Sequence, residues 1–340
     1  MIEDSYALSP LQQGLLFHSL YAPHSGVDIE QIVCALHEDL KVRAFEAAWQ
    51  RVIQRHAALR TSFRWTDLDQ PVQEVQAIVQ CPLEQQDWRG LSNDEAETRW
   101  AAYVQADRQR SFDLGYAPIM RLAVFRLAEA DYRFIWTFHH ALLDGRSFLL
   151  ILKEVQNYYE AFCQGLDIQL EQPRPYRDYI EWLQHKDFSA SREFWRQLLK
   201  GFTISTRLAV DKLPAGQAGG EKDYASQRIQ LSFRLSPELT LALQSFARQH
   251  QLTLNTLLQG AWALLLSRYS SEDEVVFGAT RACRRSALEG VGGESMVGVF
   301  INTLPVRVRV PPDVSALKWL HELRARSLAV RQHEHTPLAQ

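Results

Sequence analysis

The sequence has few cysteines, and their spacing excludes the common uses of paired thiols. Four occur in 340 residues, at Cys34, Cys81, Cys163 and Cys283, and no C-x-x-C pair is among them. Disulfide frameworks and structural zinc sites both need closely patterned cysteines. We therefore expect four reduced thiols within the core of the protein.

An excess of charge of one sign is also missing. The 37 basic and 40 acidic side chains give a formal charge of −3, which provides no electrostatic reason to bind nucleic acid or an anionic membrane. The apolar stretch at 256–267 is too short to span a bilayer and predicts a buried helix. The opening IEDSYALSPLQQ has neither the basic start nor the apolar run of a secretory signal. We expect a cytoplasmic protein with no nucleic-acid or membrane partner.

Several motifs for catalysis and cofactor binding are missing as well. The sequence has no G-x-S-x-G elbow, no phosphate-binding P-loop and no G-x-G-x-x-G in a strand–helix setting, and GVGG at 290–293 fits a flexible loop. The adjacent His139 and His140 have no third ligand at a suitable spacing, and HEH at 333–335 is expected to be solvated. No metal site is therefore predicted.

The first half of the chain contains clear structural periodicities. Apolar residues recur at three- and four-residue spacing over 42–56, which predicts an amphipathic helix. The aromatic and β-branched segments 118–127 and 131–140 flank a short polar connection and predict a hairpin. A second helix is predicted over 146–162, and its core face is formed by Phe148, Leu149, Leu152, Val155, Tyr159 and Phe162. The motif HHALLDG at 139–145 therefore occupies a strand-to-helix loop.

The second half has a similar order of elements. A strand is expected over 228–235, and a helix follows in which Ser236 is the N-cap and Pro237 lies in the first turn. Further strands are expected at 274–280 and in VFINTLPVRVRV, where alternating apolar residues indicate one buried face. The segment 211–227 fits a long loop. Two α+β layers in tandem are implied, with a boundary near EQPRPYRDY and a site between the two lobes.

The loop HHALLDG offers the chemistry of a general base. An imidazole with a pKa near 6.5 accepts a proton at cellular pH, and adjacent strand residues point to opposite faces, so one histidine would face substrate. Asp144 is placed to hold the loop through an arginine or backbone amides, and Gly145 permits close approach of substrate. The lack of a protein nucleophile favours direct transfer between two bound substrates. From the residues alone, however, paired histidines at the end of a strand more often pack and form hydrogen bonds than catalyse, so a purely structural role is favoured.

HHALLDG resembles the HHxxxDG motif shared by chloramphenicol acetyltransferase, acyl-CoA-dependent acyltransferases and the condensation domains of nonribosomal peptide synthetases. Further segments resemble condensation-domain signatures and occur in the order of that family. They are LSPLQQGLLFHSL (8–20), RHAALRTSF (55–63), FDLGYAPIMRL (112–122), YRDYIEW (176–182), FWRQLL (194–199) and MVGVFINTLPVRV (296–308).

This resemblance implies an α+β fold of two chloramphenicol acetyltransferase-like lobes in a V-shaped pseudo-dimer. We expect residues 1–172 to form the first lobe and 173–340 the second, with the second truncated at its C-terminal end. The implied enzyme joins a donor peptidyl or acyl thioester to the amine of an acceptor aminoacyl thioester. Both substrates would arrive on the 4'-phosphopantetheine arms of upstream and downstream peptidyl carrier proteins, beside an adenylation domain, and the domain itself would bind no cofactor.

The resemblance also implies roles for individual residues. His140 would point at the reacting amine, whereas His139 and Asp144 would be structural. Arg60 is the candidate ion-pair partner of Asp144, and the Gly145 amide would lie near the developing oxyanion. Two further residues, Ser147 and Asn302, would line the substrate tunnel.

The sequence also departs from the family pattern. Ala57 stands where the family often has Glu, and the chain stops after HEHTPLAQ, which predicts an exposed sheet edge and poor solubility. The alternatives are an epimerisation domain, a coenzyme A-dependent acyltransferase, a non-catalytic module that binds carrier proteins, and an inactive fragment. VGVFINT has the condensation form, the loop lacks the aspartates of heterocyclisation domains, and SPLQQGLLFH weakly favours a D-configured donor.

Overall fold

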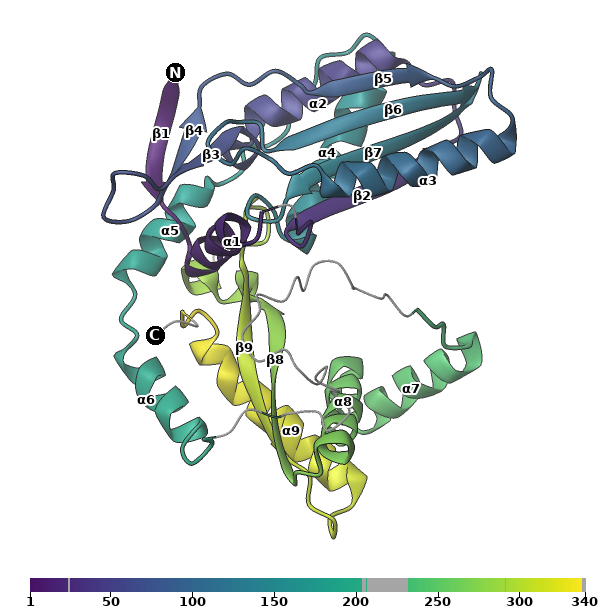
Figure 1. The fold of residues 1–340 in the computed structure, drawn as a ribbon. Coiled ribbons are helices and arrows are strands. Elements are labelled where there is room, and N and C mark those ends of the chain that lie inside the picture. The colour runs from purple at the N-terminus through teal and green to yellow at the C-terminus, as the bar shows by residue number, and fades with distance from the viewer. Residues whose placement is uncertain (24, 204–205, 207–231, 291, 338–340) are drawn as a thin grey trace, which may run out of the picture. The chain divides into compact units, whose positions relative to one another are not determined.

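Two structural units divide the described part of the chain (Figure 1). The computed structural model describes residues 1–340 except 24, 204–205, 207–231, 291 and 338–340. The first unit contains residues 1–186 and 287–301, and the second contains 187–286 and 302–340. The observed division thus differs from the boundary expected between residues 172 and 173. That the units form a V-shaped pseudo-dimer of acetyltransferase-like lobes, with the second lobe truncated, stays a prediction.

A four-stranded sheet forms the centre of the first unit. Its strands follow the order β2 (Ile29–Leu36), β7 (Asp131–His139), β6 (Met120–Ala128) and β5 (Leu83–Asp87). β6 and β7 pair in antiparallel register, which confirms the predicted hairpin, and β5 lies parallel to β6. This register places the end of β7, where the motif begins, beside the start of β2, because Ile29 pairs with His139.

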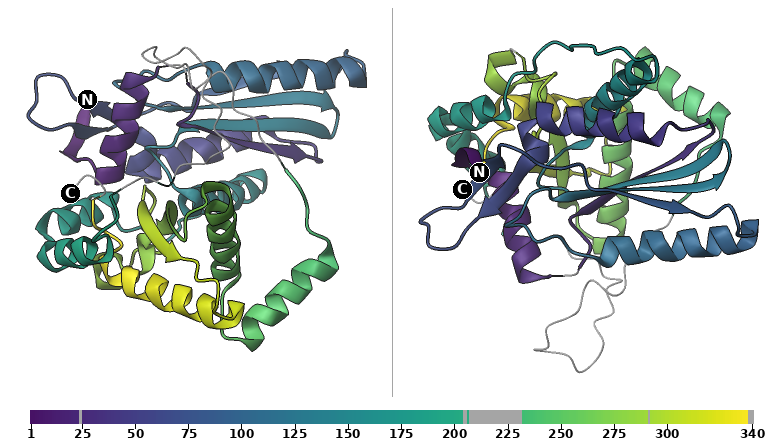
Figure 2. Two further views of the ribbon diagram at one scale, coloured as in Figure 1. Left: turned by 60° about the horizontal axis from the view of Figure 1, so that its bottom comes forward. Right: turned by 90° about the horizontal axis from the view of Figure 1, so that it is seen from above.

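The two faces of this sheet are covered by different helices, because side chains alternate along each strand. Phe134, Trp136 and Phe138 of β7 belong to the core formed with α2 (Val42–Arg55) and α4 (Gly145–Cys163). The intervening Ile135 packs in a separate cluster with Trp88 and Trp100, and Trp100 lies on α3 (Asn93–Gln109). Both views in Figure 2 show α3 on one side of the strands and the α2–α4 pair on the other.

The helices predicted at 42–56 and 146–162 are confirmed as α2 and α4. The buried residues of α2 repeat at the predicted spacing, and Trp49 contacts Trp136 edge to face with ring centroids 4.9 Å apart. Val155 and Tyr159 of α4 are buried as expected. Leu149 is 52% exposed, so its assignment to the core face was wrong, and Ile151 and Tyr158 are buried on that helix as well.

A second sheet and several helices complete the first unit. The sheet is antiparallel, and its strand order is β1 (Ile2–Ala7), β4 (Val72–Gln76), β3 (Thr61–Arg64). Helix α1 is stabilised at its start by a capping box, in which Ser9 and Gln12 exchange side-chain to backbone hydrogen bonds. The remaining helical elements are α1 (Pro10–Tyr21), η1 (Ala57–Arg60), α5 (Tyr176–His185) and η3 (Ala287–Gly290).

The second unit has its own hydrophobic core. Strands β8 and β9 pair, and their buried Val275 and Val308 pack with Leu266, Trp319 and Leu323. The predicted N-cap is confirmed, because the Ser236 hydroxyl accepts a hydrogen bond from the amide of Leu239. The described elements are α6 (Ser189–Leu198), α7 (Pro237–Gln249), α8 (Leu254–Ser270), β8 (Glu274–Ala282), η2 (Cys283–Arg285), β9 (Ile301–Arg309), α9 (Ala316–Val330) and η4 (Arg331–His333). Together, the two units confirm the α+β class.

Three expectations for the second half need correction or fall outside the described residues. The helix expected to be buried at 256–267 lies in α8, but Leu258, Trp262 and Leu265 are about half exposed. Residues 232–235 form no strand, and residues 228–231 with the segment 211–227 lie outside the described residues. Glu334 and His335 of HEH are 4% and 5% exposed, so the motif is not solvated as predicted.

Candidate functional site

HHALLDG joins strand β7 to helix α4, as the sequence predicted. β7 ends at His139 and α4 begins at Gly145, so Asp144 is the N-cap of the helix. Its Oδ1 atom accepts hydrogen bonds from the amides of Arg146 at 3.2 Å and Ser147 at 2.9 Å. A carboxylate at this position satisfies amides that have no partner within the helix and is stabilised by the helix dipole.

The same loop is bound to a segment about 150 residues later in the chain. The other carboxylate oxygen of Asp144 accepts a hydrogen bond from the Phe300 amide at 3.0 Å, and the Asp144 amide donates to the Gly298 carbonyl at 3.2 Å. The Ser147 hydroxyl donates to that carbonyl at 2.7 Å and accepts from the Gly298 amide at 2.9 Å. Asp144 and Ser147 therefore hold the loop against residues 298–300.

Tyr176 supports residues 298–300 from the side. Its buried hydroxyl donates to the Val299 carbonyl at 2.8 Å, and its ring lies where a side chain on Gly298 would be, only 2.2 Å from an added Cβ. Sequence reasoning missed this contact. The available signal was that YRDYIEW and VGVFINT, which contain Tyr176 and Gly298, are both segments of the family resemblance.

His139 is buried, and both of its ring nitrogens have hydrogen-bond partners. Its side chain is 2% exposed, and its Nδ1 accepts a hydrogen bond from the Ala141 amide at 3.2 Å. The proton of the neutral ring therefore lies on Nε2, which is 2.9 Å from the Ser19 hydroxyl. Burial lowers the pKa of His139 to about 4, although Asp28 opposes this shift. The ring is thus neutral at physiological pH.

His140 has the hydrogen-bonding arrangement of a general base. Its amide donates to the Asp28 carbonyl at 2.8 Å, and its Nδ1 lies 2.9 Å from the Leu143 carbonyl. Because a carbonyl only accepts, the neutral ring carries its proton on Nδ1 and leaves the Nε2 lone pair available. The side chain is half-buried, and Nε2 has no hydrogen-bond partner among the described residues. The two histidines therefore differ in their hydrogen bonding, and their catalytic and structural roles stay predictions.

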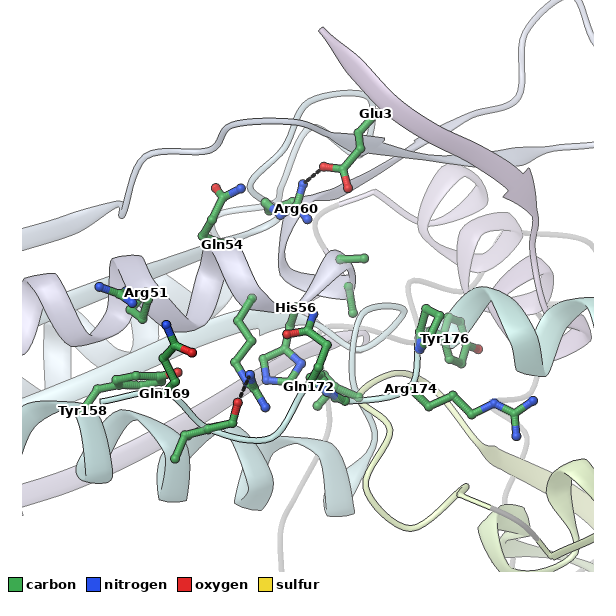
Figure 3. A pocket seen from close by; sticks show the side chains of 17 residues that line it. Glu3, Arg51, Gln54, His56, Arg60, Tyr158, Gln169, Gln172, Arg174 and Tyr176 are labelled. Atoms are coloured by element: carbon green, nitrogen blue, oxygen red, sulfur yellow. Dashed lines mark hydrogen bonds and ion pairs between the residues drawn. The ribbon is translucent and has the colours of Figure 1, made fainter. Parts of the chain in front are cut away.

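Arg60 does not pair with Asp144, so that prediction was wrong. Its guanidinium forms an ion pair with Glu3 at 2.5 Å and donates to the Gln76 carbonyl, because η1 delivers Arg60 to the edge where β1 and β4 pair. Figure 3 shows this ion pair among the side chains that line a cavity. The volume of the cavity is about 600 Å³. The cavity is lined by four arginines and contains neither His139 nor His140, so it is separate from the chemistry of the motif.

The structure gives the other predicted site residues definite environments. Gly145 is the first residue of α4, and its amide has no acceptor in the described part of the chain. Ser147 is fully buried and bound to Gly298, which gives it a structural role. In the second unit, the Asn302 amide donates to the carbonyls of Glu334 and Thr336 at 2.9 and 2.8 Å. The tunnel positions of Ser147 and Asn302 stay predictions.

Two general features of the described residues complete this description. They contain no group of three histidine, cysteine or acidic side chains that is arranged to hold a metal ion. Their helices include none with the length and apolar character needed to cross a membrane. All four cysteines are free thiols; Cys283 is buried and the other three are partly buried.

Comparisons with known proteins agree on one family. The Condensation domain model matches residues 2–340. A linear gramicidin synthase protein of Brevibacillus parabrevis is 46% identical over 337 residues, and bacitracin synthase 3 of Bacillus licheniformis is 34% identical over 339. These matches cover 99% and 100% of this chain but 4% and 5% of those proteins. The chain thus spans a small part of the curated relatives that it matches.

Solved structures show the same fold at low sequence identity. The starter condensation domain of a rhizomide synthetase superposes with a TM-score of 0.80 at 22% identity, covering 98% of this chain and 73% of that one. The first condensation domain of the calcium-dependent antibiotic synthetase gives a TM-score of 0.78 at 16% identity, covering 98% of this chain and 76% of that one. Identity at this level is informative about the fold alone.

Proposed function

The chain belongs to the condensation-domain family, and on that basis we propose that it catalyses amide-bond formation between two thioester substrates. The amine of an aminoacyl thioester attacks the carbonyl carbon of a donor peptidyl or acyl thioester. A C–N bond forms, the C–S bond breaks, one amine proton leaves and the released sulfur takes up a proton. Atoms and charge balance without a redox step or a covalent enzyme intermediate.

The free Nε2 lone pair of His140 is the observation that carries this proposal. The Leu143 carbonyl fixes the ring so that Nε2 is available to accept a hydrogen bond or a proton from the attacking amine. His139 cannot take this role, because its two ring nitrogens are bound to the Ala141 amide and the Ser19 hydroxyl. His140 is therefore the proposed catalytic residue.

The start of α4 supports a second part of the mechanism. Asp144 binds the amides of Arg146 and Ser147, which leaves the Gly145 amide as the unbound donor of the first turn among the described residues. A free amide at the positive end of a helix stabilises developing negative charge. We assign the Gly145 amide to the oxyanion of the tetrahedral intermediate. Asp144 would position both this amide and the loop that holds His140.

The substrates and partners follow from the relatives. The matched proteins belong to peptide synthetases, and a four-domain nonribosomal peptide synthetase is among the structures with the same fold. We propose that both thioesters are presented on 4'-phosphopantetheine arms of carrier proteins, and that an adenylation domain works beside this domain. No cofactor of its own is required by this chemistry.

The test is to reconstitute the reaction with two loaded carrier proteins and measure the dipeptidyl product by mass spectrometry. We expect His140→Ala to lower the rate by about 10²–10⁴-fold, which is the usual contribution of a positioned general base. His37→Ala is the matched control, because that histidine is 75% exposed and pairs only with Asp131 at the surface. Both variants should keep the melting temperature of the wild type.

Three outcomes would count against the proposal. Turnover by His140→Ala within tenfold of the wild type would remove His140 from the chemistry. Inversion of a loaded aminoacyl group without a new amide would identify an epimerisation domain instead. Binding of carrier proteins with no reaction by the wild type would identify a non-catalytic module.

A further inference from the structure

A second cavity of the first unit lies directly behind the histidine motif. It has a volume of about 250 Å³ and is formed by the end of α1, residues 22–23, 25–26 and 28–29, Trp65 directly after β3, and the segment 111–114. His139 is part of its wall. The volume is below that of sites for drug-sized ligands and suits a group the size of one amino-acid side chain.

Asp28 provides the buried charge of this cavity. Its side chain is 9% exposed, and one carboxylate oxygen, Oδ2, accepts hydrogen bonds from His18 at 2.7 Å and Ser19 at 2.8 Å. The other oxygen, Oδ1, has no hydrogen-bond partner among the described residues and is open to the cavity rather than sealed within the core. A buried carboxylate is stable when its charge is paired, so an unused oxygen at a cavity is a site for a donor.

The remaining charges around the cavity favour a cation as that donor. Asp113 adds a second, exposed carboxylate, and the described residues that line the wall include no lysine or arginine. The His139 ring is neutral at physiological pH. Arg108 is the basic residue packed against this loop, but its guanidinium donates to the Ile29 carbonyl and to Gln31. Among the described residues, the His18 imidazole is the one basic group that pairs with these carboxylates, and no lysine or arginine pairs with either of them.

The rest of the wall is apolar and would contact a hydrocarbon chain. It includes the side chains of Leu20, Pro23, Trp65, Phe112 and Leu114. An apolar wall with a carboxylate matches an alkylammonium group, in which a chain of methylenes ends in a positive charge.

The cavity is also close to the reacting centre along the backbone. The carbonyl of Asp28 accepts the hydrogen bond from the His140 amide at 2.8 Å, so both residues belong to the same local structure. We propose that this cavity is a specificity subsite that binds the alkylammonium side chain of a lysine- or ornithine-like substrate, with Asp28 as its counter-ion. The inference rests on the proposed amide-forming function.

The first experiment compares lysyl and norleucyl substrates, which differ at the end of the side chain. One arm presents them as the acceptor with a fixed alanyl donor, and the other arm presents them as the donor with a fixed alanyl acceptor. We expect kcat/KM to favour lysyl by about tenfold or more in one arm. The arm that shows the preference identifies which substrate occupies the cavity.

Two variants locate this preference. Asp28→Asn removes the charge but keeps an oxygen that accepts from Ser19 and His18, and it should abolish the preference for lysyl. Ala22→Leu leaves the carboxylate intact but fills the cavity, so it should lower kcat/KM for both long side chains relative to alanyl. Asp113→Asn is the matched control, because that carboxylate is exposed and accepts from the Gly115 amide at 3.0 Å. It should retain more of the preference than Asp28→Asn.

A binding measurement separates failure of this inference from failure of the proposed function. Pentylammonium and 1-pentanol are titrated into the full chain and followed by NMR, with no turnover required. We expect the wild type to bind pentylammonium about tenfold more tightly than 1-pentanol. The Asp28→Asn variant should bind the two ligands with equal affinity. Equal binding by the wild type, no preference in either kinetic arm, or a preference that persists in Asp28→Asn would overturn the subsite. Loss of all amide formation with intact pentylammonium binding would overturn the proposed function alone.

Discussion

His139 is a histidine whose protonation the fold opposes. Burial lowers its pKa to about 4 in the folded state, whereas an unfolded chain has a histidine pKa near 6.5. The neutral form is therefore favoured by folding, and its contribution to stability is complete above pH 6.5. That contribution is lost as the pH falls from 6.5 to 4, because the unfolded state then binds a proton that the folded state does not.

We predict that this single residue lowers the free energy of unfolding by about 3 kcal/mol between pH 7 and pH 4. Urea denaturation at several pH values measures the effect. The comparison is with His139→Asn, which cannot titrate and should show a shallower dependence of stability on pH over this interval. Equal slopes for the two proteins would show that His139 is not the group responsible.

Asp144 is predicted to stabilise the motif through the backbone. Asp144→Ala removes the N-cap of α4 and leaves the Phe300 amide without its acceptor, which should cost about 2 to 4 kcal/mol. Ser92→Ala is a matched control, because Ser92 caps α3 at the surface and should cost about 1 kcal/mol. Thermal and chemical unfolding measure both. A loss for Asp144→Ala no larger than that for Ser92→Ala would contradict the role of the Phe300 contact.

At the scale of whole elements, replacing either of two glycines by alanine should change the stability of the protein, but in opposite directions. Gly14 lies within α1 with no atom near an added Cβ, so Gly14→Ala should stabilise the protein by about 0.5 to 1 kcal/mol. An added Cβ at Gly298 would lie 2.2 Å from the Tyr176 ring, so Gly298→Ala should destabilise by about 1 to 3 kcal/mol or more.

Melting temperature and amide-forming rate are measured for both variants. Because residues 298–300 hold Asp144, Gly298→Ala should also slow catalysis, whereas Gly14→Ala should not. If Gly298→Ala melted and reacted like the wild type, the packing of Tyr176 on this segment would not support the motif.

Elements with a local pattern were predictable from the sequence. The helices α2 and α4 and the β6–β7 hairpin each bury one face, so their periodicity is present within a short window. Helix α8 was predicted wrongly, because it lacks such a one-sided pattern. Its apolar residues surround the helix without a polar face, and composition alone does not say that one side stays exposed.

Contacts between distant segments were not predictable in this way. Strand geometry predicted that one of the two adjacent histidines faces substrate, whereas the assignment of that role to His140 rests on the family resemblance and stays a proposal. Asp144 was expected to bind an arginine or backbone amides, but its place as the N-cap of α4 was not predicted. The partner of Arg60 depends on the register of β1 against β4, and the partners of Asp144 include residues 298–300. No pattern within either segment encodes such a pairing, so the expected Arg60–Asp144 pair was wrong.

At the scale of the whole molecule, the second unit exposes a contiguous apolar surface. Leu258, Trp262, Leu265 and Tyr269 are spaced by three or four residues along α8, and each is about half exposed. Such spacing places them on one face of the helix, and exposed patches of this kind bind other apolar surfaces.

We predict that the 340-residue chain binds the dye ANS and self-associates through this face. Leu258→Lys with Trp262→Lys should reduce both dye fluorescence and the apparent mass in sedimentation. Leu149→Lys is the matched control, because Leu149 is equally exposed but lies alone on α4. Unchanged dye binding in the α8 variant would show that the exposed face is not the cause of association.

The contact between Ser147 and Gly298 also has a consequence for synthesis on the ribosome. The two residues are 151 positions apart, and chains elongate at roughly 5–20 residues per second, so the motif exists for roughly 8–30 s before its anchor is made. During this interval the local cap of α4 by Asp144 has its partners, but Asp144 and Ser147 lack their contacts with residues 298–300. The order of translation thus delays the anchoring of the motif until residues 298–300 have left the ribosome, and a nascent chain that stops before them would contain both histidines without the support that positions their loop.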